Sequence, residues 1–425
     1  AKFGARMEGR DCLTLDMGGT TAKASIVEGG QVARTGDYEV GAGINLSSKL
    51  VMGGGYALKL PVIDISEIGA GGGSIVSIDR GGLLHVGPRS AGAMPGPVAY
   101  DRGGTDPTFT DAVVTLGYLN PAGLVGGDLK LAAGKARAAL EERVAKPLGR
   151  ATLDTAYGIF EVACGTMVRA VKAVSTYRGR DPRDFALFAF GGNGPVVGAA
   201  LADLLEMREV IVPPDPGVFS AVGLLLSDIE QERSRAFLRR LTGVEPAAME
   251  AAYAELAAAI RADLEADGYE AKDVALARFA DLRYAGQAHE LLVPYATTKA
   301  GEADFAAMAE AFAAEHRRTY GHAAEAEAVE CVALRIKGCV IAEAKAEPDA
   351  AAALRAAKKT ANSTRLAYFG PAAGQVSVPV ISRATLGDGE RQGPLIVEEY
   401  DSTCVVPPRW SAHLDGAANI RLIRE

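Results

Sequence analysis

The sequence predicts an α/β fold with a parallel sheet, followed by a C-terminal α+β region that ends in a small β subdomain. Apolar strands at residues 185–190 and 208–214 flank a helical stretch at 195–207. Strands that alternate with helices in this way imply parallel pairing through crossovers. A further strand at residues 13–17 is followed by two glycines and two threonines. We therefore expect a ligand site where a strand of this sheet ends.

The bend after the first strand, LTLDMGGTTAK, has the residue order of a phosphate-binding β-turn. Asp16 ends the strand, where its carboxylate can hold a metal-bound water, and Lys23 follows on the next strand. Between Asp16 and Lys23, backbone N–H groups can close on a phosphate oxygen. The residues that would contribute them are Gly18, Gly19, Thr20 and Thr21.

The segment after this bend alternates as a strand, turns at Gly29-Gly30 and continues as another strand. A P-loop or a Rossmann loop would instead pass from its glycines into a helix. A turn between antiparallel strands resembles the phosphate hairpin of the actin, sugar-kinase and Hsp70 class of ATPases. The alternative is an ordinary hairpin turn in which the glycines serve only backbone geometry.

A second nucleotide-binding element is predicted where the apolar strand at 185–190 ends. The turn contains Gly191, Gly192, Asn193 and Gly194, and Pro195 stands at the first position of the next helix. Glycines here let the backbone lie against a purine or ribose, and a helix N-terminus carries partial positive charge. The alternative is a generic strand-to-helix turn.

A third glycine-rich element, IGAGGGSI, contains Gly71, Gly72 and Gly73. Glycines weaken a strand interior, so contact with an anion or a substrate carbonyl is one interpretation and a tight corner is the other. Residues 101–105, DRGGT, imitate the first bend, but they follow PGPVAY rather than a buried strand. We do not interpret them as a phosphate loop.

The remaining chain divides into regions of different character. Residues 90–112, rich in Pro and Gly, are expected to form an ordered loop, and DPGVFSAVG at 215–223 a turn. We predict an ATPase domain at 1–235, an α+β part at 236–345 and a small β-rich subdomain at 346–425. Basic residues near the end of the helix at 153–175 are weaker candidates for phosphate contact. A histidine in GQAHE is a weaker candidate for a catalytic base. They are Arg169, Lys172, Arg178, Arg180 and His289.

Composition excludes several classes of function. The net charge of −8, with no long basic run, makes nucleic acid an unlikely partner. Five cysteines without CxxC spacing argue against a zinc site or a disulfide framework and favour reduced thiols in the cytoplasm. No apolar stretch is long enough for a membrane span. Because Ala1 replaces a starting Met, we expect a chain that begins inside a larger gene product or one subunit of a split one.

With these motifs laid out, the chain resembles the hydantoinase A / 5-oxoprolinase family. The similarity runs through LTLDMGGTTAK, LPVIDISEIGAGGGSIVSID, VGPRSAGAMPGPVAYDRGGTDPTFTDA, STYRGRDPRDFALFAFGGNGP, VIVPPDPGVFSAVGLLLSD, LRYAGQAHELLVP and GPLIVEEYDSTCVVPPRW. The resemblance implies an actin-like ATPase fold, ATP with Mg²⁺, and a cyclic amide substrate such as hydantoin or 5-oxoproline. Related acetone and acetophenone carboxylases use the same ATPase part on ketones, and a hydantoinase B-type partner subunit commonly completes the enzyme. Family members also carry an earlier DxGGT-like loop that this chain lacks, so a partner chain could supply it.

These observations give a specific expectation for the site. Asp16 would orient the metal hydrate and Gly18–Thr21 would bind the β- and γ-phosphates, while Gly191–Gly194 would flank the adenosine. The expected enzyme opens a cyclic amide by ATP-dependent phosphoryl transfer to its oxygen. The alternatives are a ketone carboxylase subunit and a non-catalytic ATPase-like scaffold.

Overall fold

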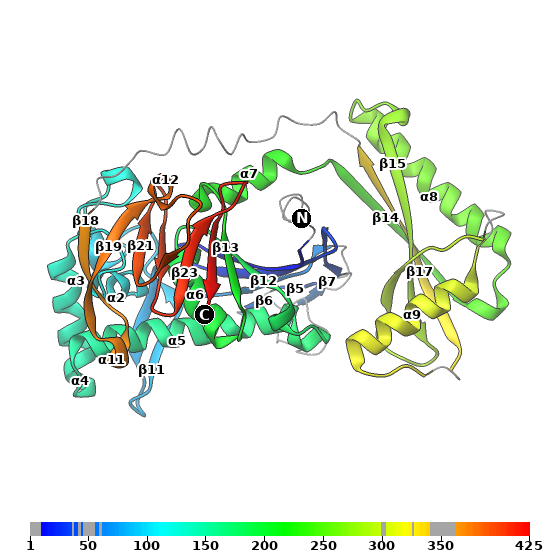
Figure 1. Cartoon of the computed structure of the whole chain (residues 1–425). Coiled ribbons are helices and arrows are strands. Elements are labelled where there is room, and N and C mark those ends of the chain that lie inside the picture. The colour runs from blue at the N-terminus through cyan, green and yellow to red at the C-terminus, as the bar shows by residue number, and fades with distance from the viewer. Residues whose placement is uncertain are drawn as a thin grey trace. The chain divides into compact units, whose positions relative to one another are not determined.

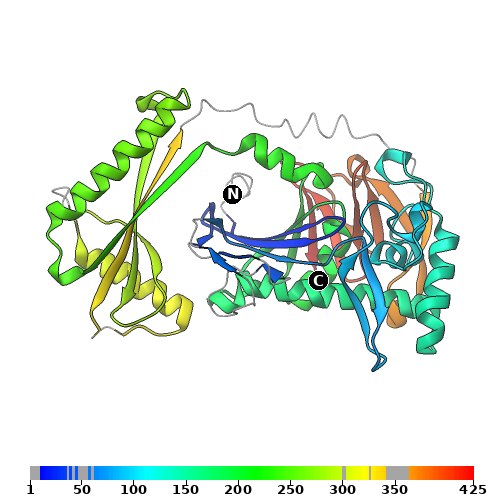
Figure 2. The same ribbon diagram turned by 180° about the vertical axis from the view of Figure 1, so that it is seen from behind.

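The computed structural model describes residues 10–35, 38–40, 44–45, 56–58, 62–298, 303–324, 327–340 and 363–425. The chain forms two compact units (Figures 1 and 2). Unit 1 comprises Ala1–Tyr177, Asp181–Leu225 and Pro348–Glu425, and unit 2 comprises Arg178–Arg180 and Leu226–Glu347. None of the helices within the described ranges is long and apolar enough to cross a membrane.

The described part of unit 1 is built on a ten-stranded sheet with the order β20-β23-β24-β13-β12-β1-β2-β9-β6, to which β3 is added beside β2. Its strands are β1 (Cys12–Met17), β2 (Ala22–Glu28), β3 (Gln31–Val32), β6 (Ile44–Asn45), β9 (Ile65–Ile68), β12 (Ala186–Phe190), β13 (Glu209–Val212), β20 (Arg391–Gln392), β23 (Trp410–Leu414) and β24 (Ile420–Arg424).

The centre of this sheet confirms the predicted strand directions. β1 pairs antiparallel with β2, while β1 and β12, and then β12 and β13, pair parallel. All four residues of β13 are buried, as expected for a strand covered on both faces. The carboxyl ends of β1 and β12 therefore meet at one edge, with Asp16 in register with Phe190. This register brings the first two predicted bends together.

Helices and smaller strands complete unit 1. The helix α5 runs along the sheet and packs against β2, β9 and α6 (Figures 1 and 2). The helices are α2 (Phe109–Thr115), α3 (Ala133–Leu140), α4 (Lys146–Leu148), α5 (Thr152–Val174), α6 (Gly194–Leu204), α7 (Phe219–Leu226), α11 (Gly370–Ala373) and α12 (Arg383–Leu386). The further strands are β4 (Arg34–Thr35), β5 (Tyr38–Val40), β7 (Tyr56–Leu58), β8 (Val62–Ile63), β10 (Ser74–Ile78), β11 (Leu84–Ser90), β18 (Ser363–Tyr368), β19 (Gln375–Ser382), β21 (Leu395–Glu398) and β22 (Thr403–Val406).

The C-terminal strands of unit 1 are distributed over two sheets. β18, β19, β21 and β22 form a small four-stranded sheet. β24 instead pairs with β13 in the large sheet, and the stretch from Pro348 clusters with the N-terminal residues rather than standing apart. The expected domain boundaries near residues 235 and 345 remain predictions, and most of the stretch at 345–364 lies outside the described residues.

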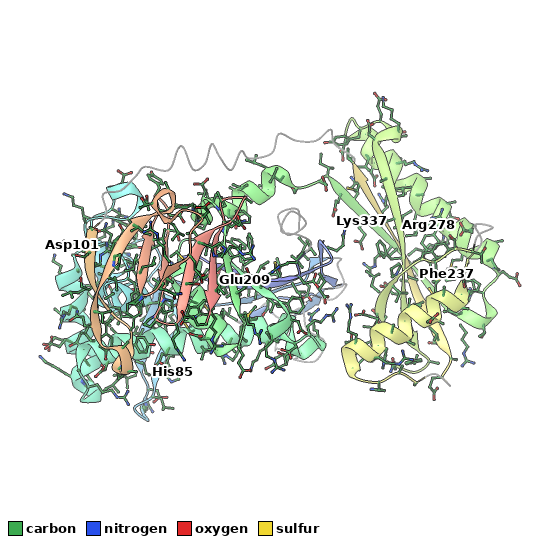
Figure 3. All side chains as sticks on the ribbon, in the orientation of Figure 1. His85, Asp101, Glu209, Phe237, Arg278 and Lys337 are labelled. Atoms are coloured by element: carbon green, nitrogen blue, oxygen red, sulfur yellow. The ribbon has the colours of Figure 1, made fainter. Side chains whose placement is uncertain are left out.

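Unit 2 is an α+β unit with a four-stranded antiparallel sheet of order β14-β17-β15-β16. Two amphipathic helices bury their apolar faces in its core, for example at Tyr253 and Phe312. The elements are β14 (Glu230–Arg240), β15 (Val274–Tyr284), β16 (Leu291–Pro294), β17 (Val329–Val340), α8 (Pro246–Ala266) and α9 (Phe305–Tyr320). Figure 3 labels Arg278, which lies over the rings of Tyr253 and Tyr295.

Two local expectations were wrong. The stretch at 215–223 was predicted to be a turn, but α7 begins at Phe219 and occupies most of it. The expected loop at 90–112 ends early because α2 begins at Phe109, where Thr108 and Asp111 form a reciprocal capping box.

Candidate functional site

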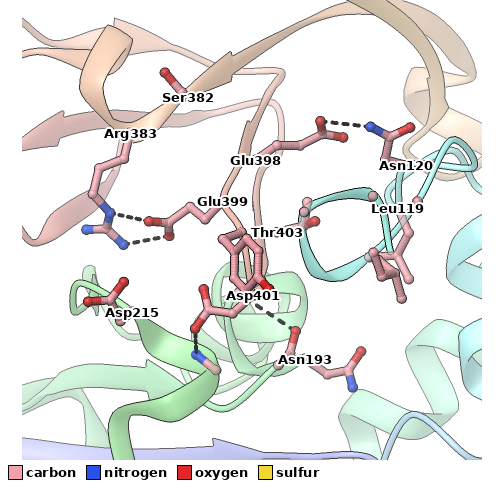
Figure 4. A pocket seen from close by; sticks show the side chains of 18 of the residues that line it. Leu119, Asn120, Asn193, Asp215, Ser382, Arg383, Glu398, Glu399, Asp401 and Thr403 are labelled. Atoms are coloured by element: carbon pink, nitrogen blue, oxygen red, sulfur yellow. Dashed lines mark hydrogen bonds and ion pairs between the residues drawn. The ribbon is translucent and has the colours of Figure 1, made fainter. Parts of the chain in front are cut away.

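A cavity of about 730 Å³ lies in unit 1, and it is lined by the first two predicted bends together with segments far along the chain (Figure 4). The hairpin bend contributes Gly18 and Gly19, and the second bend contributes Gly192 and Asn193. The rest of the lining comes from residues near 100, 110, 119–127, 214–217, 382–383, 398–403 and 418. Ligands of open α/β sheets bind at the carboxyl ends of the strands, which is where these bends lie.

Asn193 connects the two bends directly. Its backbone N–H donates to the Met17 carbonyl at 2.9 Å. Its side-chain Nδ2 donates to the Gly18 carbonyl at 3.2 Å, across 175 positions of sequence. The predicted meeting of the two bends in space is therefore confirmed as geometry.

The glycines of the two bends differ in why they are needed. A Cβ added at Gly18 or Gly19 would have no atom within 4 Å, and neither residue has a positive φ. Gly191 has φ +79°, and an added Cβ would lie 2.5 Å from Asp16 Oδ1. The fold thus requires glycine at 191. Beside Gly18 and Gly19 the fold leaves open space. A ligand that approaches the backbone closely needs such space.

The third predicted element packs against the hairpin bend. Gly72 N–H donates to the Gly18 carbonyl at 3.0 Å, and Gly73 N–H donates to the Gly19 carbonyl at 2.6 Å. A Cβ at Gly71 would lie 2.6 Å from the Thr20 backbone. None of these three glycines is among the residues that line the cavity. Their observed role is to let two backbones meet, which supports the interpretation as a tight corner.

Asp16 lies beside the cavity lining rather than within it. Among the described residues its carboxylate accepts a hydrogen bond from one side chain, the Ser220 hydroxyl of α7 at 3.0 Å. Lys23 lies opposite Asp16 on β2, half exposed, 4.0 Å from Glu67. A partly exposed carboxylate with free lone pairs next to a phosphate-type bend is the donor that Mg²⁺ prefers, so Asp16 fits that ion.

The other predicted site residues lie near the cavity without lining it. Gly18 N–H donates to the Thr21 carbonyl at 3.1 Å, which closes the bend. Thr20 is exposed at its tip, and Gly194 begins α6. The structure thus brings the predicted site residues together, but only four of them line the cavity. These four are Gly18, Gly19, Gly192 and Asn193.

The cavity lining also carries carboxylates that our reading of the sequence did not assign. Asp215, Glu398, Glu399 and Asp401 line it together with Arg383 (Figure 4). Burial raises the pKa of the Glu399 carboxyl despite its ion pair with Arg383. Burial, and secondarily the neighbouring Asp215 carboxylate, raise the pKa of Asp401. The motifs VIVPPDPGVF and VEEYDST contained these residues, but nothing local in the sequence joins them to the glycine bends.

Arg383 holds this wall together. It is only 3% exposed. Its guanidinium donates to the carbonyls of Val212 at 3.2 Å, Pro213 at 2.7 Å and Ala418 at 2.7 Å, as well as to both oxygens of Glu399. All of its donors are thereby used, so Arg383 positions three segments of the lining rather than offering a free cation.

The segment at 101–105, which imitates the first bend in sequence, has a different local structure. It follows a short 3₁₀ turn, and Asp101 forms an exposed ion pair with Lys135 at 2.6 Å (Figure 3). The weaker candidates are also not among the residues that line the cavity; Arg178, Arg180 and His289 belong to unit 2. Arg169 and Lys172 lie on α5 and are not among the lining residues.

Comparison with known proteins gives a consistent result. The Hydantoinase/oxoprolinase family model matches residues 1–233, and the Hydantoinase/oxoprolinase C-terminal domain model matches residues 242–424. The chain is 36% identical to an uncharacterised protein of Methanocaldococcus jannaschii over all of this chain and 60% of that protein. It is 31% identical to the caprolactamase subunit alpha of Pseudomonas jessenii over 96% of this chain and 58% of that subunit.

Solved structures agree. The ATP-dependent caprolactamase of Pseudomonas jessenii superposes with a TM-score of 0.81 at 30% identity, covering 99% of this chain and 60% of that one. A nucleotide-free acetone carboxylase gives a TM-score of 0.73 at 24% identity, covering 100% and 60%. The expected actin-like ATPase fold is confirmed. The chain spans about 60% of the length of these relatives, and it belongs to the hydantoinase/oxoprolinase family.

Proposed function

We propose that this chain is a subunit of an ATP-dependent cyclic amidohydrolase of the hydantoinase or 5-oxoprolinase type. The observation that carries the proposal is the meeting of the two bends around one cavity, where the fold itself does not need glycine at Gly18 and Gly19. Open space beside the backbone of this bend suits a phosphate, and the second bend suits the nucleoside attached to it.

The proposed roles follow the geometry of the cavity. The backbone of Gly18–Gly19 and the hydroxyls of Thr20 and Thr21 would bind the β- and γ-phosphates. Asp16 would hold Mg²⁺ through water, and Lys23 would add positive charge beside it. Gly191–Gly194 would flank the adenosine. Mg²⁺ would supply charge neutralisation on the phosphates.

Gly71, Gly72 and Gly73 would act indirectly in this proposal. Their backbone supports the hairpin bend through hydrogen bonds to Gly18 and Gly19. This support fixes the direction of the N–H groups before a ligand arrives, and such preorganisation is what makes backbone dipoles effective in phosphoryl transfer.

The proposed chemistry is phosphoryl transfer to the lactam or imide oxygen. The γ-phosphoryl group leaves ATP and bonds to that oxygen, which gives ADP and an imidate phosphate. Water then adds to the carbon and the C–N bond breaks, which gives a ring-opened amine that carries an acyl phosphate. A second water cleaves the acyl phosphate and releases the ring-opened acid and inorganic phosphate. Activation is needed because the carbon of an unactivated amide is a weak electrophile, and phosphorylation of its oxygen opens that carbon to attack by water. The similarity to a caprolactamase subunit over nearly the whole chain supports a cyclic amide as substrate.

A ketone carboxylase subunit is the second candidate. The chain is 38% identical to the acetophenone carboxylase gamma subunit of Aromatoleum aromaticum, over 55% of this chain and 32% of that subunit. In this alternative the activated species would be an enol phosphate or carboxyphosphate. Because several relatives are named as subunits, we also propose a hydantoinase B-type partner, a chain that supplies a first phosphate loop, or both.

A substrate panel tests the proposal. Purified protein, with every chain that co-purifies, is incubated with ATP, Mg²⁺ and hydantoins, 5-oxoproline, other lactams, or ketones with labelled bicarbonate. We expect ADP release coupled to a ring-opened acid for one cyclic amide. Label in a β-keto acid would establish the carboxylase alternative instead. If no compound of the panel supports ATP turnover and the protein does not bind ATP, both the amidohydrolase and the carboxylase proposals are overturned.

A further inference from the structure

The segment at residues 90–112 reaches the cavity through two side chains that carry hydroxyl groups. Tyr100 and Thr110 are both among the lining residues, although the segment at 101–105 separates them in sequence. Tyr100 ends the 3₁₀ turn Val98–Tyr100, and Thr110 lies in the first turn of α2. The roles proposed above for binding the nucleotide use neither side chain. This part of the lining is therefore open to another assignment.

Tyr100 is held in place from two sides. The Asp111 carboxylate accepts from the backbone N–H groups of Val98 at 3.2 Å and Ala99 at 2.7 Å, which fixes the turn that carries Tyr100. On the other side, a Cβ added at Gly96 would lie 2.9 Å from Tyr100 Cδ2. Gly96 also has φ +76°, so both the backbone and the ring contact require glycine there. The fold therefore fixes the direction of the Tyr100 side chain.

Thr110 links Tyr100 to the hairpin bend. The backbone N–H and the hydroxyl of Thr110 both donate to the Gly72 carbonyl at 2.8 Å. Gly72 N–H in turn donates to the Gly18 carbonyl at 3.0 Å. A Cβ added at Gly72 would lie 2.9 Å from Thr110 Oγ1 and 2.8 Å from Asn193 Nδ2. The Thr110 hydroxyl thus lies where the two bends meet, and Tyr100 is its neighbour in the lining.

The Tyr100 phenol presents a neutral acceptor to a ligand in the cavity. It is hydrogen-bonded to the Thr110 side chain. Because Thr110 gives its only hydroxyl proton to Gly72, the phenol must supply the proton of their bond. Lone pairs of the phenol oxygen are then left for a ligand. Burial, and secondarily the Asp111 carboxylate, raise the pKa of this phenol, so it stays neutral and does not repel a nearby phosphate.

A ligand that binds to this oxygen must therefore donate a hydrogen bond. The oxygens of an ionised phosphate only accept, whereas the ring N–H of a cyclic amide is a donor. Recognition through the N–H also leaves the amide oxygen free to receive the γ-phosphoryl group. We infer that the Tyr100 phenol accepts a hydrogen bond from the ring N–H of the cyclic amide and so selects substrates whose ring nitrogen carries hydrogen. This inference rests on the proposed function, because it assigns the amide to the part of the cavity beside the phosphates.

The test compares wild type with Tyr100→Phe, each as the 425-residue chain with every chain that co-purifies. The probes are hydantoin, 5-oxoproline and caprolactam, with ATP and Mg²⁺. For the amide that is opened, Tyr100→Phe should raise KM about fivefold, because one neutral hydrogen bond is lost. The calorimetric Kd for ATP should stay unchanged, although the nucleotide carries donors on its sugar and base. Phenylalanine keeps the ring contact with Gly96, so the variant should unfold at the urea concentration of wild type.

The N-methyl analogue of the same amide, used as an inhibitor, separates the N–H from the rest of the ring. Its inhibition constant should not rise in Tyr100→Phe, because it has no N–H to donate. Tyr177→Phe is the matched control, since Tyr177 is 41% exposed and outside the cavity lining; it should keep the wild-type KM.

Three results would overturn the inference: an unchanged KM for the amide in Tyr100→Phe, an equal loss of affinity for the N-methyl analogue, or weaker ATP binding by this variant. Failure of the proposed function would look different. Wild type itself would then open none of the three amides, and the inference would fall with it.

Discussion

Two segments of unit 1 share the pattern Asp-x-Gly-Gly-Thr, at residues 16–20 and 101–105, and use their glycines for opposite reasons. In the first, a Cβ at either glycine would meet nothing within 4 Å. In the second, Gly103 has φ +90° and a Cβ at Gly104 would lie 2.2 Å from the Gly96 carbonyl. The second pair is required by the local fold, while the first pair leaves room for a ligand.

The carboxylates of the two segments differ as well. Asp16 lies one residue before the end of β1 and accepts from one hydroxyl among the described residues. Asp101 instead pairs with Lys135, and the residues on either side of 101–105 are held by Asp111, whose carboxylate accepts from the backbone N–H groups of Val98, Ala99 and Thr108. A carboxylate with its lone pairs already used serves structure, whereas one with free lone pairs can serve chemistry.

The largest expected effect separates the two aspartates. Asp16→Asn should lower ATP turnover about a hundredfold, because it removes the charge that would hold the metal hydrate. Asp101→Asn loses only an exposed ion pair with Lys135 and should leave turnover unchanged. Steady-state ADP release by each purified variant, with the best substrate of the panel, measures both. Equal activity of Asp16→Asn and wild type would favour the scaffold alternative.

A second contrast uses the glycines. Gly104→Ala should lower the free energy of unfolding by about 1–3 kcal/mol, because the new methyl group overlaps a backbone carbonyl. Gly19→Ala should leave stability unchanged or slightly raised, yet weaken ATP binding about tenfold by obstructing a phosphate. Urea unfolding and calorimetry on both variants give the two quantities. An unstable Gly19→Ala protein, or one with full ATP affinity, contradicts the assignment.

The smallest effect concerns pH. Burial raises the pKa of the Asp111 carboxyl, although its hydrogen bonds act in the opposite direction. The folded protein then binds this proton more tightly than the unfolded chain. Asp111 therefore contributes stability that is present below the unfolded pKa near 3.8 and is lost as pH rises through the folded value. Urea unfolding of wild type and Asp111→Asn across acidic pH should show a smaller slope in the variant, because Glu399 and Asp401 keep their raised pKa while the contribution of Asp111 is lost.

Local sequence patterns predicted much of the fold and half of the site. The strand LTLDM, the strand FALFAF and the glycines after each can be read within a few residues. Their parallel pairing then follows from the strand–helix alternation between them. The strand β14 (Glu230–Arg240) was not predicted, because its charged sequence lacks the alternation of a half-buried strand. The charges are matched across the sheet instead, as in the Glu232–Arg335 pair at 2.8 Å.

The carboxylates that line the cavity could not be predicted for a different reason. Asp215 and Asp401 are separated by 186 positions (401 minus 215) and meet because the chain returns to the small sheet after leaving for unit 2. No spacing rule links residues at that distance. Arg383, which ties this wall to the end of β13, is equally remote from Val212 in sequence.

A crystal structure of the chain with Mg²⁺ and a non-hydrolysable ATP analogue tests the central claim most directly. The account predicts one nucleotide in the cavity, with phosphates against the backbone of Gly18 and Gly19 and the sugar beside Asn193. A nucleotide bound elsewhere on unit 1, or one whose phosphates lie away from Gly18 and Gly19, would contradict it.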